Sequence, residues 1–367
     1  MRIVRLANFV ASRSGGLRTA LTELGAGYLA AGHDAVLIVP GERDGDEVTR
    51  QGRVITLRGP RVPFSGGYRV LLCRRRIARL LTSLGPDSLE VSDRTTLRWT
   101  GRWARRHGVR AVMVSHESLA ALLRMALPLP ALARALADTL NRRTARAYNQ
   151  VICTTAWAAA EFERIAAANL RRAPLGVDLA TFVPRVSART ADVVLVHCGR
   201  LSPEKRPDRS LTTLGTLTAA GLGARLIVAG DGPLRERLER QAASEGLPVT
   251  FTGFISDRAG LAALLGAADV VLAPGPAETF GLAAVEALAC GTPVVVSAES
   301  ALPEVIGDAG ASVAGDDLAD GVRAVLARPE PERRAAARAR AELFGWPVAV
   351  REFLLIHAAG EAERITT

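Results

Sequence analysis

The strongest constraint on the fold is an alternation of short apolar runs with helical patterns, and this alternation restarts once along the chain. Runs rich in valine, leucine and isoleucine, such as residues 2–9, 35–40 and 110–115, are separated by segments whose apolar residues recur at helical spacing. Strands that alternate with helices form βαβ units, which build a parallel sheet with helices on its faces. The sequence therefore predicts a doubly wound α/β fold.

A proline- and glycine-punctuated segment, residues 174–185, separates the two rounds of alternation. A chain of 367 residues exceeds what one hydrophobic core usually supports, so two domains are expected. We predict one Rossmann-like domain over residues 1–180 and a second over residues 181–345, with the two sheets facing a central cleft. Residues 346–367 are predicted to form a C-terminal helix that packs back on the first domain.

Composition excludes several classes of protein. No apolar run approaches the ~20 residues of a membrane span, and the N-terminus is typical of a strand and not of a signal peptide. The four cysteines match no metal-binding spacing, which is typical of a reduced cytoplasmic protein. Only 4% of the residues are aromatic, so the basic residues lack the stacking partners of a nucleic-acid platform. We expect a cytoplasmic protein that binds no nucleic acid.

Positive charge is concentrated in the first half of the chain. Residues 1–185 carry 29 basic and 14 acidic side chains, whereas residues 186–367 carry 18 and 23. Either these arginines form a solvated surface, or the first half binds an anionic membrane face or a phosphorylated acceptor. A peripheral position on the cytoplasmic face of the plasma membrane is the second hypothesis. Three clusters of arginines support this hypothesis. They lie at Arg74, Arg75 and Arg76, at Arg102, Arg105 and Arg106, and at Arg142, Arg143 and Arg146.

Lysine is nearly absent from the sequence. The chain contains 46 arginines and one lysine, Lys205. Such a bias indicates a GC-rich coding background, which replaces lysine codons by arginine codons. A lysine that persists against this background is predicted to have a role that a forked guanidinium does not fill.

Two carboxylates, Glu278 and Glu286, interrupt the apolar stretch 273–295. A carboxylate in apolar surroundings is costly unless it is paired or hydrogen-bonded. The stretch predicts a strand, a loop and a helix that begins near Gly281, whose N-terminal N–H groups suit a phosphate. Glu286 is then placed to accept ribose hydroxyls, and Glu278 to meet a sugar on that phosphate. For either glutamate alone, a structural role remains the alternative.

Polar and glycine residues also follow several other predicted strands. In open α/β sheets, ligands bind beyond the carboxyl ends of the strands, so residues at these ends are candidates for one site. They are Gly15 and Gly16, Asp93, His116 and Glu117, Gly199 and Arg200, Gly230 to Gly232, and Glu278.

The pair Glu278 and Glu286 resembles the E-x(7)-E motif of retaining glycosyltransferases of family 4, which have the GT-B fold. Residues 197–205, HCGRLSPEK, are similar to the donor-phosphate segment of that family. Residues 226–233 and 249–254 are similar to its second nucleotide loop and its base-binding strand. The resemblance covers essentially the whole chain. One departure is Arg206-Pro207, where the family commonly has a glycine.

The resemblance implies a retaining hexosyltransferase that needs neither a metal nor a cofactor. Arg200 and Lys205 would neutralise the departing diphosphate, and His116 would orient the reacting partners beside the donor sugar. The implied catalytic residues are His116, Arg200, Lys205 and Glu278, and Asp93 and His116 are the candidates for acceptor binding. The implied donor-binding residues are Gly16, Arg200, Lys205, Gly230, Phe254, Glu278, Phe280, Gly281, Leu282 and Glu286.

The N-terminal segments SGGLRTA, EVSDRTTLRW and VSHESL are most similar to actinobacterial GDP-mannose-dependent α-mannosyltransferases of phosphatidylinositol mannoside and glycolipid synthesis. This implies transfer of a hexose, mannose above all, from a nucleotide sugar to a lipid or polar-alcohol acceptor. The alternative is transfer, for example of GlcNAc from a UDP-sugar, to a soluble inositol or aminocyclitol. A catalytically silent sugar-nucleotide or lipid-binding protein is the alternative from another class. Asp44-Gly-Asp46 spells a D-x-D metal signature, which we interpret as a solvated turn.

Overall fold

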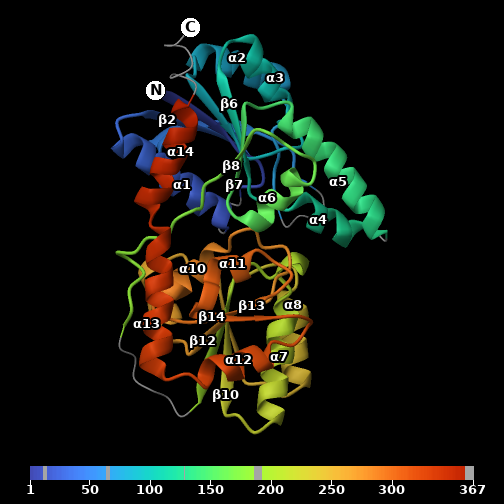
Figure 1. Ribbon diagram of the computed structural model, residues 1–367, viewed down its shortest axis with the longest axis vertical. Helices are drawn as coiled ribbons and strands as arrows, with labels where there is room; N and C mark the ends of the chain where they lie inside the picture. Colours follow the sequence, from blue (N-terminus) through green and yellow to red (C-terminus); the bar gives the residue numbers. More distant parts are fainter. Residues whose placement is uncertain (11–14, 63–66, 128, 186–191, 360–367) are drawn as a thin grey trace. The chain divides into compact units, whose positions relative to one another are not determined.

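The computed structural model describes residues 1–10, 15–62, 67–127, 129–185 and 192–359. It divides into two units: Met1–Leu175 with the C-terminal segment that begins at Trp346, and Gly176–Gly345. Each unit is a largely parallel sheet with helices on both faces (Figure 1). The prediction of two Rossmann-like α/β domains is confirmed.

Unit 1 is built on an eight-stranded sheet of order β3-β4-β2-β1-β5-β6-β7-β8. Every neighbouring pair is parallel except β3 and β4. The strands are β1 (Arg2–Leu6), β2 (Asp34–Gly41), β3 (Gly45–Thr49), β4 (Gly52–Arg58), β5 (Ser88–Val91), β6 (Arg110–Ser115), β7 (Gln150–Cys153) and β8 (Leu170–Arg172).

The antiparallel edge strand β3 corrects the interpretation of the D-x-D sequence. Asp44 directly precedes β3 and Asp46 lies within it, so this segment is an edge strand and not a turn. Asp46 forms an ion pair with Arg53 at 2.6 Å, and Asp44 forms one with Arg76 at 2.9 Å. Charged side chains are common on edge strands because they discourage pairing with another chain.

The helices of unit 1 begin where the sequence supplies caps. The hydroxyls of Ser118 and Thr155 accept backbone N–H groups of the first turns that follow them, and Pro130 opens its helix at the first position. The helices are α1 (Gly16–Ala30), α2 (Arg74–Leu84), α3 (Trp99–Arg106), α4 (Leu119–Ala126), α5 (Pro130–Ala145), α6 (Ala156–Glu163) and α14 (Trp346–Ala358).

The last helix, α14, packs against α1 within unit 1. A side chain at Gly27 would collide with Val350, since a Cβ there would lie 2.2 Å from a valine methyl. His357 is buried and lies 2.7 Å from the hydroxyl of Ser88 and 3.1 Å from the carboxylate of Glu90. The contacts of His357 with Ser88 and Glu90 form only when the helix is seated, so they fix α14 on the sheet.

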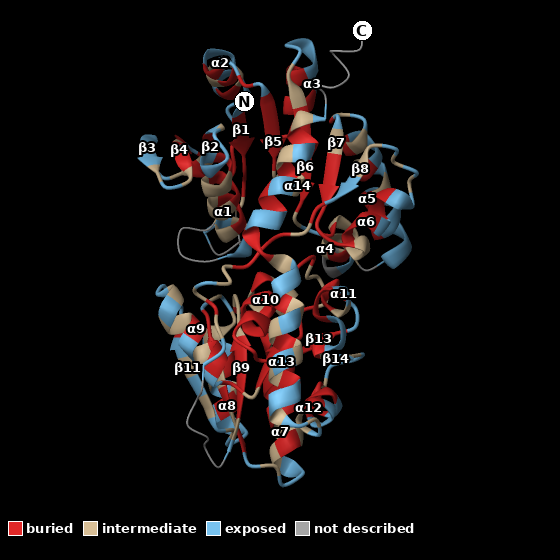
Figure 2. Ribbon diagram, turned by 60° about the vertical axis from the view of Figure 1, so that its left-hand side comes forward, coloured by how far each residue is buried: buried red, intermediate tan, exposed pale blue. Residues whose placement is uncertain are grey.

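Unit 2 is built on a six-stranded parallel sheet of order β11-β10-β9-β12-β13-β14. Its central strands are buried on both faces, which explains their valine-rich sequences (Figure 2). The strands are β9 (Val193–Cys198), β10 (Ala224–Ala229), β11 (Val249–Gly253), β12 (Val270–Ala273), β13 (Val294–Ser297) and β14 (Gly310–Val313). The helices are α7 (Pro207–Ala219), α8 (Arg235–Ser244), α9 (Arg258–Ala267), α10 (Leu282–Ala289), α11 (Leu302–Ile306), α12 (Ala319–Leu326) and α13 (Glu330–Ala341).

Candidate active site

The strand order of unit 2 reverses direction between β9 and β12. From β9 the chain adds β10 and β11 on one side and then β12, β13 and β14 on the other. The connections diverge at such a point and leave a crevice at the carboxyl ends of the two strands, where ligands bind in open α/β sheets. A small cavity of about 20 Å³ lies there, lined by the ends of β9 and β12 together with Lys205, Glu278 and Gly281. The structure thus brings these predicted residues together.

Lys205 and Glu278 form an ion pair beside this cavity. Lys205 ends the short helical turn Pro203–Lys205, and its Nζ donates to Oε1 of Glu278, which lies in the loop after β12. Both side chains are partly exposed, at 32% and 20%. Lys205, which is predicted to bind a phosphate, and Glu278, which is predicted to bind a sugar, are therefore neighbours. Their charges compensate each other, and each side chain remains accessible from solvent.

The departure at Arg206 has a structural explanation. Arg206 adopts the left-handed conformation, with φ 47° and ψ 50°, which favours glycine. Its guanidinium forms ion pairs with Asp208 at 2.9 Å and Asp316 at 3.1 Å. These contacts offset the backbone strain, and Pro207 then opens α7 at the first helical position.

Glu286 lies one turn inside α10 and is almost completely buried. It accepts a hydrogen bond of 2.9 Å from Arg258, whose guanidinium also lies over the ring of Phe182 at 4.6 Å. Burial raises the pKa of Glu286, and the charge of Arg258 opposes this shift. Sequence reasoning missed Arg258, although a buried glutamate demands a cation and Asp257-Arg258 begins the preceding helix.

The N-terminus of α10 points its backbone N–H groups at the same edge of the sheet. The cap residue of this helix is Gly281 with φ 73°, which has no side chain with which to cap the first turn. A Cβ on Gly281 would lie 2.3 Å from Leu302, so only glycine fits. Phe280 buries its ring against Phe344 at 5.6 Å, which leaves its backbone as the group available to a phosphate. Leu282, the first helical residue, is likewise buried and offers only its backbone.

Glycines hold the loops after β9 and β10 in backbone contact. A Cβ on Gly230 would lie 1.8 Å from the carbonyl of Gly199, so a larger residue would force the two loops apart. Arg200 follows Gly199 and is partly buried. Phe254 follows β11 and is 44% exposed, which leaves its ring accessible for stacking on a base.

A buried arginine that sequence reasoning missed supports the loop carrying Glu278. Arg209 is 5% exposed and donates to the carbonyl of Pro274 at 3.1 Å. It also forms an ion pair with Asp316 at 2.7 Å. Arg209 thereby ties the beginning of the loop after β12 to α7.

The predicted residues of unit 1 follow β5 and β6. Asp93 is buried, and its carboxylate accepts four hydrogen bonds, from Asn8, Thr95 and Thr96. Asn8 follows β1, so this network joins the loops on the two sides of the switch point of unit 1. Asp93 thus holds this loop in place by its hydrogen bonds, and its role in acceptor binding stays a prediction.

His116 follows β6 and lies 3.2 Å from the hydroxyl of Ser92 through Nε2. Burial lowers the pKa of His116 to about 4, so the imidazole is neutral at neutral pH. The next residues are held by Arg94, which donates to the carbonyl of Glu117 and, at 3.0 Å, to Asn141. Sequence reasoning missed Arg94 and its partner Glu161, which caps the first turn of α4. Gly16, the first residue of α1, is exposed.

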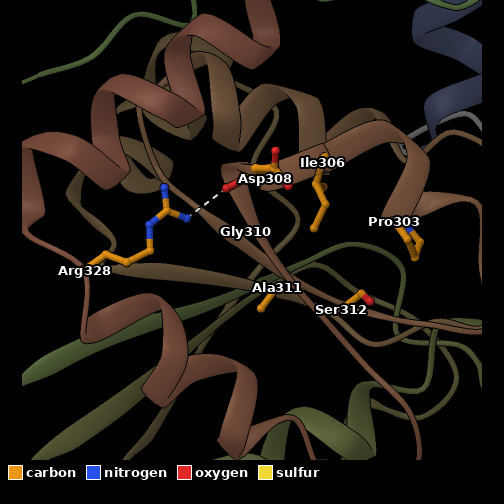
Figure 3. Close-up of a pocket in the computed structure, with 8 residues that line it drawn as sticks. Pro303, Ile306, Asp308, Gly310, Ala311, Ser312 and Arg328 are labelled. Atoms are coloured by element: carbon orange, nitrogen blue, oxygen red, sulfur yellow. Dashed lines mark hydrogen bonds between the residues drawn. The ribbon is translucent and has the colours of Figure 1, made fainter.

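A second hollow in unit 2, of about 370 Å³, contains none of the predicted residues. Its charged lining residues are Asp308 and Arg328, and Arg328 donates to the carbonyl of Asp308 at 2.8 Å (Figure 3). Among the residues that the structure describes, no group of three or more metal-ligating side chains occurs. Over the same residues, no helix is long and apolar enough to cross a membrane.

Comparison with known proteins supports a single family over nearly the whole chain. Residues 14–181 match the model described as Glycosyltransferase Family 4, and residues 182–342 match Glycosyl transferases group 1. The chain is 52% identical over 366 residues to the GDP-mannose-dependent alpha-(1-6)-phosphatidylinositol dimannoside mannosyltransferase of Mycobacterium tuberculosis, covering 96% of this chain and 95% of that protein. It is 38% identical over 196 residues to D-inositol 3-phosphate glycosyltransferase of Mycolicibacterium paratuberculosis, covering 47% of this chain and 43% of that protein.

The fold agrees with this assignment. Sucrose-phosphate synthase from Thermosynechococcus elongatus superposes with a TM-score of 0.80 at 21% identity, over 99% of this chain and 100% of that chain. HepE of Anabaena in complex with UDP-glucose superposes with a TM-score of 0.74 at 17% identity, over 99% of this chain and 100% of that chain. The chain therefore belongs to the family 4 glycosyltransferases of GT-B fold.

Proposed function

We propose that the protein transfers mannose from GDP-mannose to a mannosylated phosphatidylinositol, with retention of configuration and without a metal. The observation that carries the proposal is the 52% identity, across nearly the full length of both chains, to a mannosyltransferase that is named for GDP-mannose and for a mannosylated phosphatidylinositol. The ion-paired site at the switch point of unit 2 supplies groups suited to a nucleotide sugar.

In this proposal the donor diphosphate lies at the N-terminus of α10. The N–H groups of its first turn and the helix dipole favour negative charge there, and Arg200 and Lys205 neutralise the charge that develops on the leaving diphosphate. Glu286, oriented by Arg258, accepts the ribose hydroxyls. Glu278, which Lys205 holds in the loop after β12, accepts hydroxyls of the donor sugar.

The acceptor side of the reaction is assigned to unit 1. His116 is neutral at neutral pH and therefore offers one donor and one acceptor to sugar hydroxyls. The acceptor hydroxyl attacks the anomeric carbon on the face that the diphosphate leaves. The departing phosphate oxygen takes the proton of that hydroxyl, as implied by the front-face mechanism of the family.

A lipid acceptor further suggests that unit 1 docks on an anionic membrane. The clusters on α2, α3 and α5 place exposed arginines on three helices of the same unit. Each basic side chain near an anionic leaflet contributes about 1 kcal/mol, and this attraction is screened by salt. Full-length protein is expected to co-sediment with phosphatidylinositol-rich vesicles at low salt and to be released at high salt. Indifference to such vesicles at low salt would favour a soluble acceptor.

The decisive test of the donor is a comparison of nucleotide sugars. GDP-mannose, GDP-glucose, UDP-glucose and UDP-GlcNAc would be compared for thermal stabilisation, for slow hydrolysis, and for transfer to phosphatidylinositol dimannoside in mixed micelles. GDP-mannose is expected to lead in all three measurements, and the anomeric configuration of the product is expected to match that of the donor. Preference for UDP-GlcNAc with a free inositol or aminocyclitol would overturn the proposal in favour of the soluble-acceptor alternative.

A further inference from the structure

The three arginine clusters of unit 1 meet at one concave site, called the arginine pocket below. It is a hollow of about 630 Å³ between α2, α3 and α5. A volume of this size lies within the range of small-molecule sites. Its lining contains six arginines and no acidic residue; the arginines are Arg74, Arg98, Arg102, Arg105, Arg143 and Arg146.

The charge of the arginine pocket is not neutralised by the described part of the chain. Among residues 1–10, 15–62, 67–127, 129–185 and 192–359, no ion pair joins a carboxylate to any of the six arginines. Acidic residues near these helices are committed elsewhere: Asp44 pairs with Arg76, and Asp138 pairs with Arg164. Six like charges around one hollow repel one another, so an anion bound there stabilises the folded state.

One wall of the arginine pocket is held in place by a contact between two helices. Arg105 of α3 donates to the carbonyl of Arg146 at 2.6 Å, at the C-terminal end of α5. This hydrogen bond ties α3 to α5 across the hollow. Trp99 adds the one large apolar surface of the lining, against which a ring or a glycerol backbone can pack.

We propose that the arginine pocket binds a compact anion with at least two phosphoryl groups. Guanidinium forks bind phosphate oxygens in pairs, so six of them exceed what one monovalent group requires. Attraction to a membrane alone requires only exposed charge, whereas a concave site with a tethered wall recognises a ligand of limited size. The headgroup of a phosphorylated phosphoinositide and a free diphosphate or phosphorylated polyol share this chemistry. The site lies within unit 1 and requires neither the transfer reaction nor the donor site.

A matched pair of triple variants tests this inference in the full-length protein. R74Q/R102Q/R143Q removes one pocket arginine from each of α2, α3 and α5. R75Q/R106Q/R142Q removes the same number of exposed arginines from the same three helices, but none of these lines the pocket. Inorganic pyrophosphate would be titrated by calorimetry at low salt. Because all the proteins share unit 2, binding there contributes equally, and any difference between the triple variants reports on the pocket.

We expect the pyrophosphate site of unit 1 to have similar affinity in wild type and in the control triple, and at least tenfold lower affinity in the pocket triple. Equal weakening of both triples, or no saturable binding in unit 1, would overturn the proposal. Vesicles of phosphatidylcholine with phosphatidylinositol 4-phosphate distinguish the source of the anion. Sedimentation lost only in the pocket triple and displaced by pyrophosphate identifies a lipid headgroup. Equal sedimentation of both triples, with pyrophosphate binding still lost in the pocket triple, identifies a free anion. Preferential binding of single-stranded RNA that both triples lose equally would refute a compact-anion site.

Discussion

The two units share a doubly wound plan but differ in how charge is placed at their switch points. In unit 2, opposite charges meet there: Lys205 pairs with Glu278, and Arg258 pairs with Glu286. In unit 1, the loops at the switch point are joined by hydrogen bonds of Asp93. In the part of unit 1 that the structure describes, the six arginines of the arginine pocket form no ion pair with a carboxylate.

This difference indicates a division of chemical labour. Ion pairs that are partly exposed can exchange partners with a charged ligand, which suits the binding and release of a diphosphate. A saturated network with a neutral imidazole beside it suits a hydroxyl group, whose charge changes little on binding. This contrast supports the proposal that unit 2 stabilises charge and that unit 1 orients a neutral group.

The largest effect is expected from removing a cation of unit 2. Lys205→Ala and Arg200→Ala should each lower kcat roughly a hundredfold or more, as is typical for the loss of one group that stabilises transition-state charge. Lys205→Arg should also be impaired, because we predict that the forked guanidinium of arginine cannot take the place of the single lysine of the chain. Steady-state kinetics with saturating GDP-mannose measures these effects.

The neighbouring cation provides the control for this experiment. Arg206→Gly removes a positive charge next to Lys205 and relieves the left-handed backbone at that position. Arg206 forms its ion pairs with Asp208 and Asp316, and not with a group of the proposed diphosphate site. Its kcat should therefore stay within a fewfold of wild type. Near-native kcat in Lys205→Ala or Arg200→Ala would remove that residue from the diphosphate site.

A smaller effect, of about tenfold, should separate the two glutamates of unit 2. Glu286→Gln should raise the dissociation constant of GDP, since ribose contacts persist through the reaction and Arg258 is left without its carboxylate. Glu278→Gln should instead lower kcat with little change in GDP affinity, because its proposed partner is the donor sugar under attack. Calorimetry with GDP and steady-state kinetics separate the two. Equal effects of both variants on GDP binding alone would contradict the division of roles.

The sequence predicted the fold class, most of the strands and the residues at the strand ends, because a parallel sheet gathers the carboxyl ends of its strands at one edge. Glu278 was found in this way, Glu286 was found because it interrupts an apolar stretch, and Lys205 was found because it is the single lysine of the chain. The cations that orient them were not, because Arg258 meets Glu286 across 28 positions and Arg209 meets Pro274 across 65. Such pairs depend on how distant helices pack, which leaves no local pattern. Edge strand β3 was missed because the adjacent Asp46 and Glu47 make its sequence typical of a charged loop.

The two units can also be compared by how their stability changes at acid pH. Burial lowers the pKa of His116 in unit 1 and of His197 in unit 2 to about 4, with the charge of Lys205 adding to the shift of His197. Below pH 6.5 the unfolded chain binds protons that these folded imidazoles do not. The free energy of unfolding therefore falls as the pH falls from 6.5 toward 4, by about 1–3 kcal/mol per group.

Substitution of each histidine by glutamine tests this expectation. His197 is 3% exposed whereas His116 is partly exposed. His197→Gln should therefore reduce the loss of unfolding free energy at acid pH more than His116→Gln does. Denaturant unfolding of each variant at pH 7 and at pH 5 provides the measurement. If a variant loses as much unfolding free energy between pH 7 and pH 5 as wild type does, the substituted histidine does not cause the loss.

The smallest expected effect is that of removing divalent metal. In the proposed site Arg200, Lys205 and the N-terminus of α10 neutralise the diphosphate, so EDTA should leave turnover unchanged. The aspartates of the D-x-D sequence are already engaged, Asp44 by Arg76 and Asp46 by Arg53. Asp44→Asn/Asp46→Asn should accordingly retain turnover with and without EDTA. A strict requirement for Mg²⁺ or Mn²⁺ that this double variant abolishes would restore the metal-site interpretation and transfer part of the charge stabilisation to unit 1.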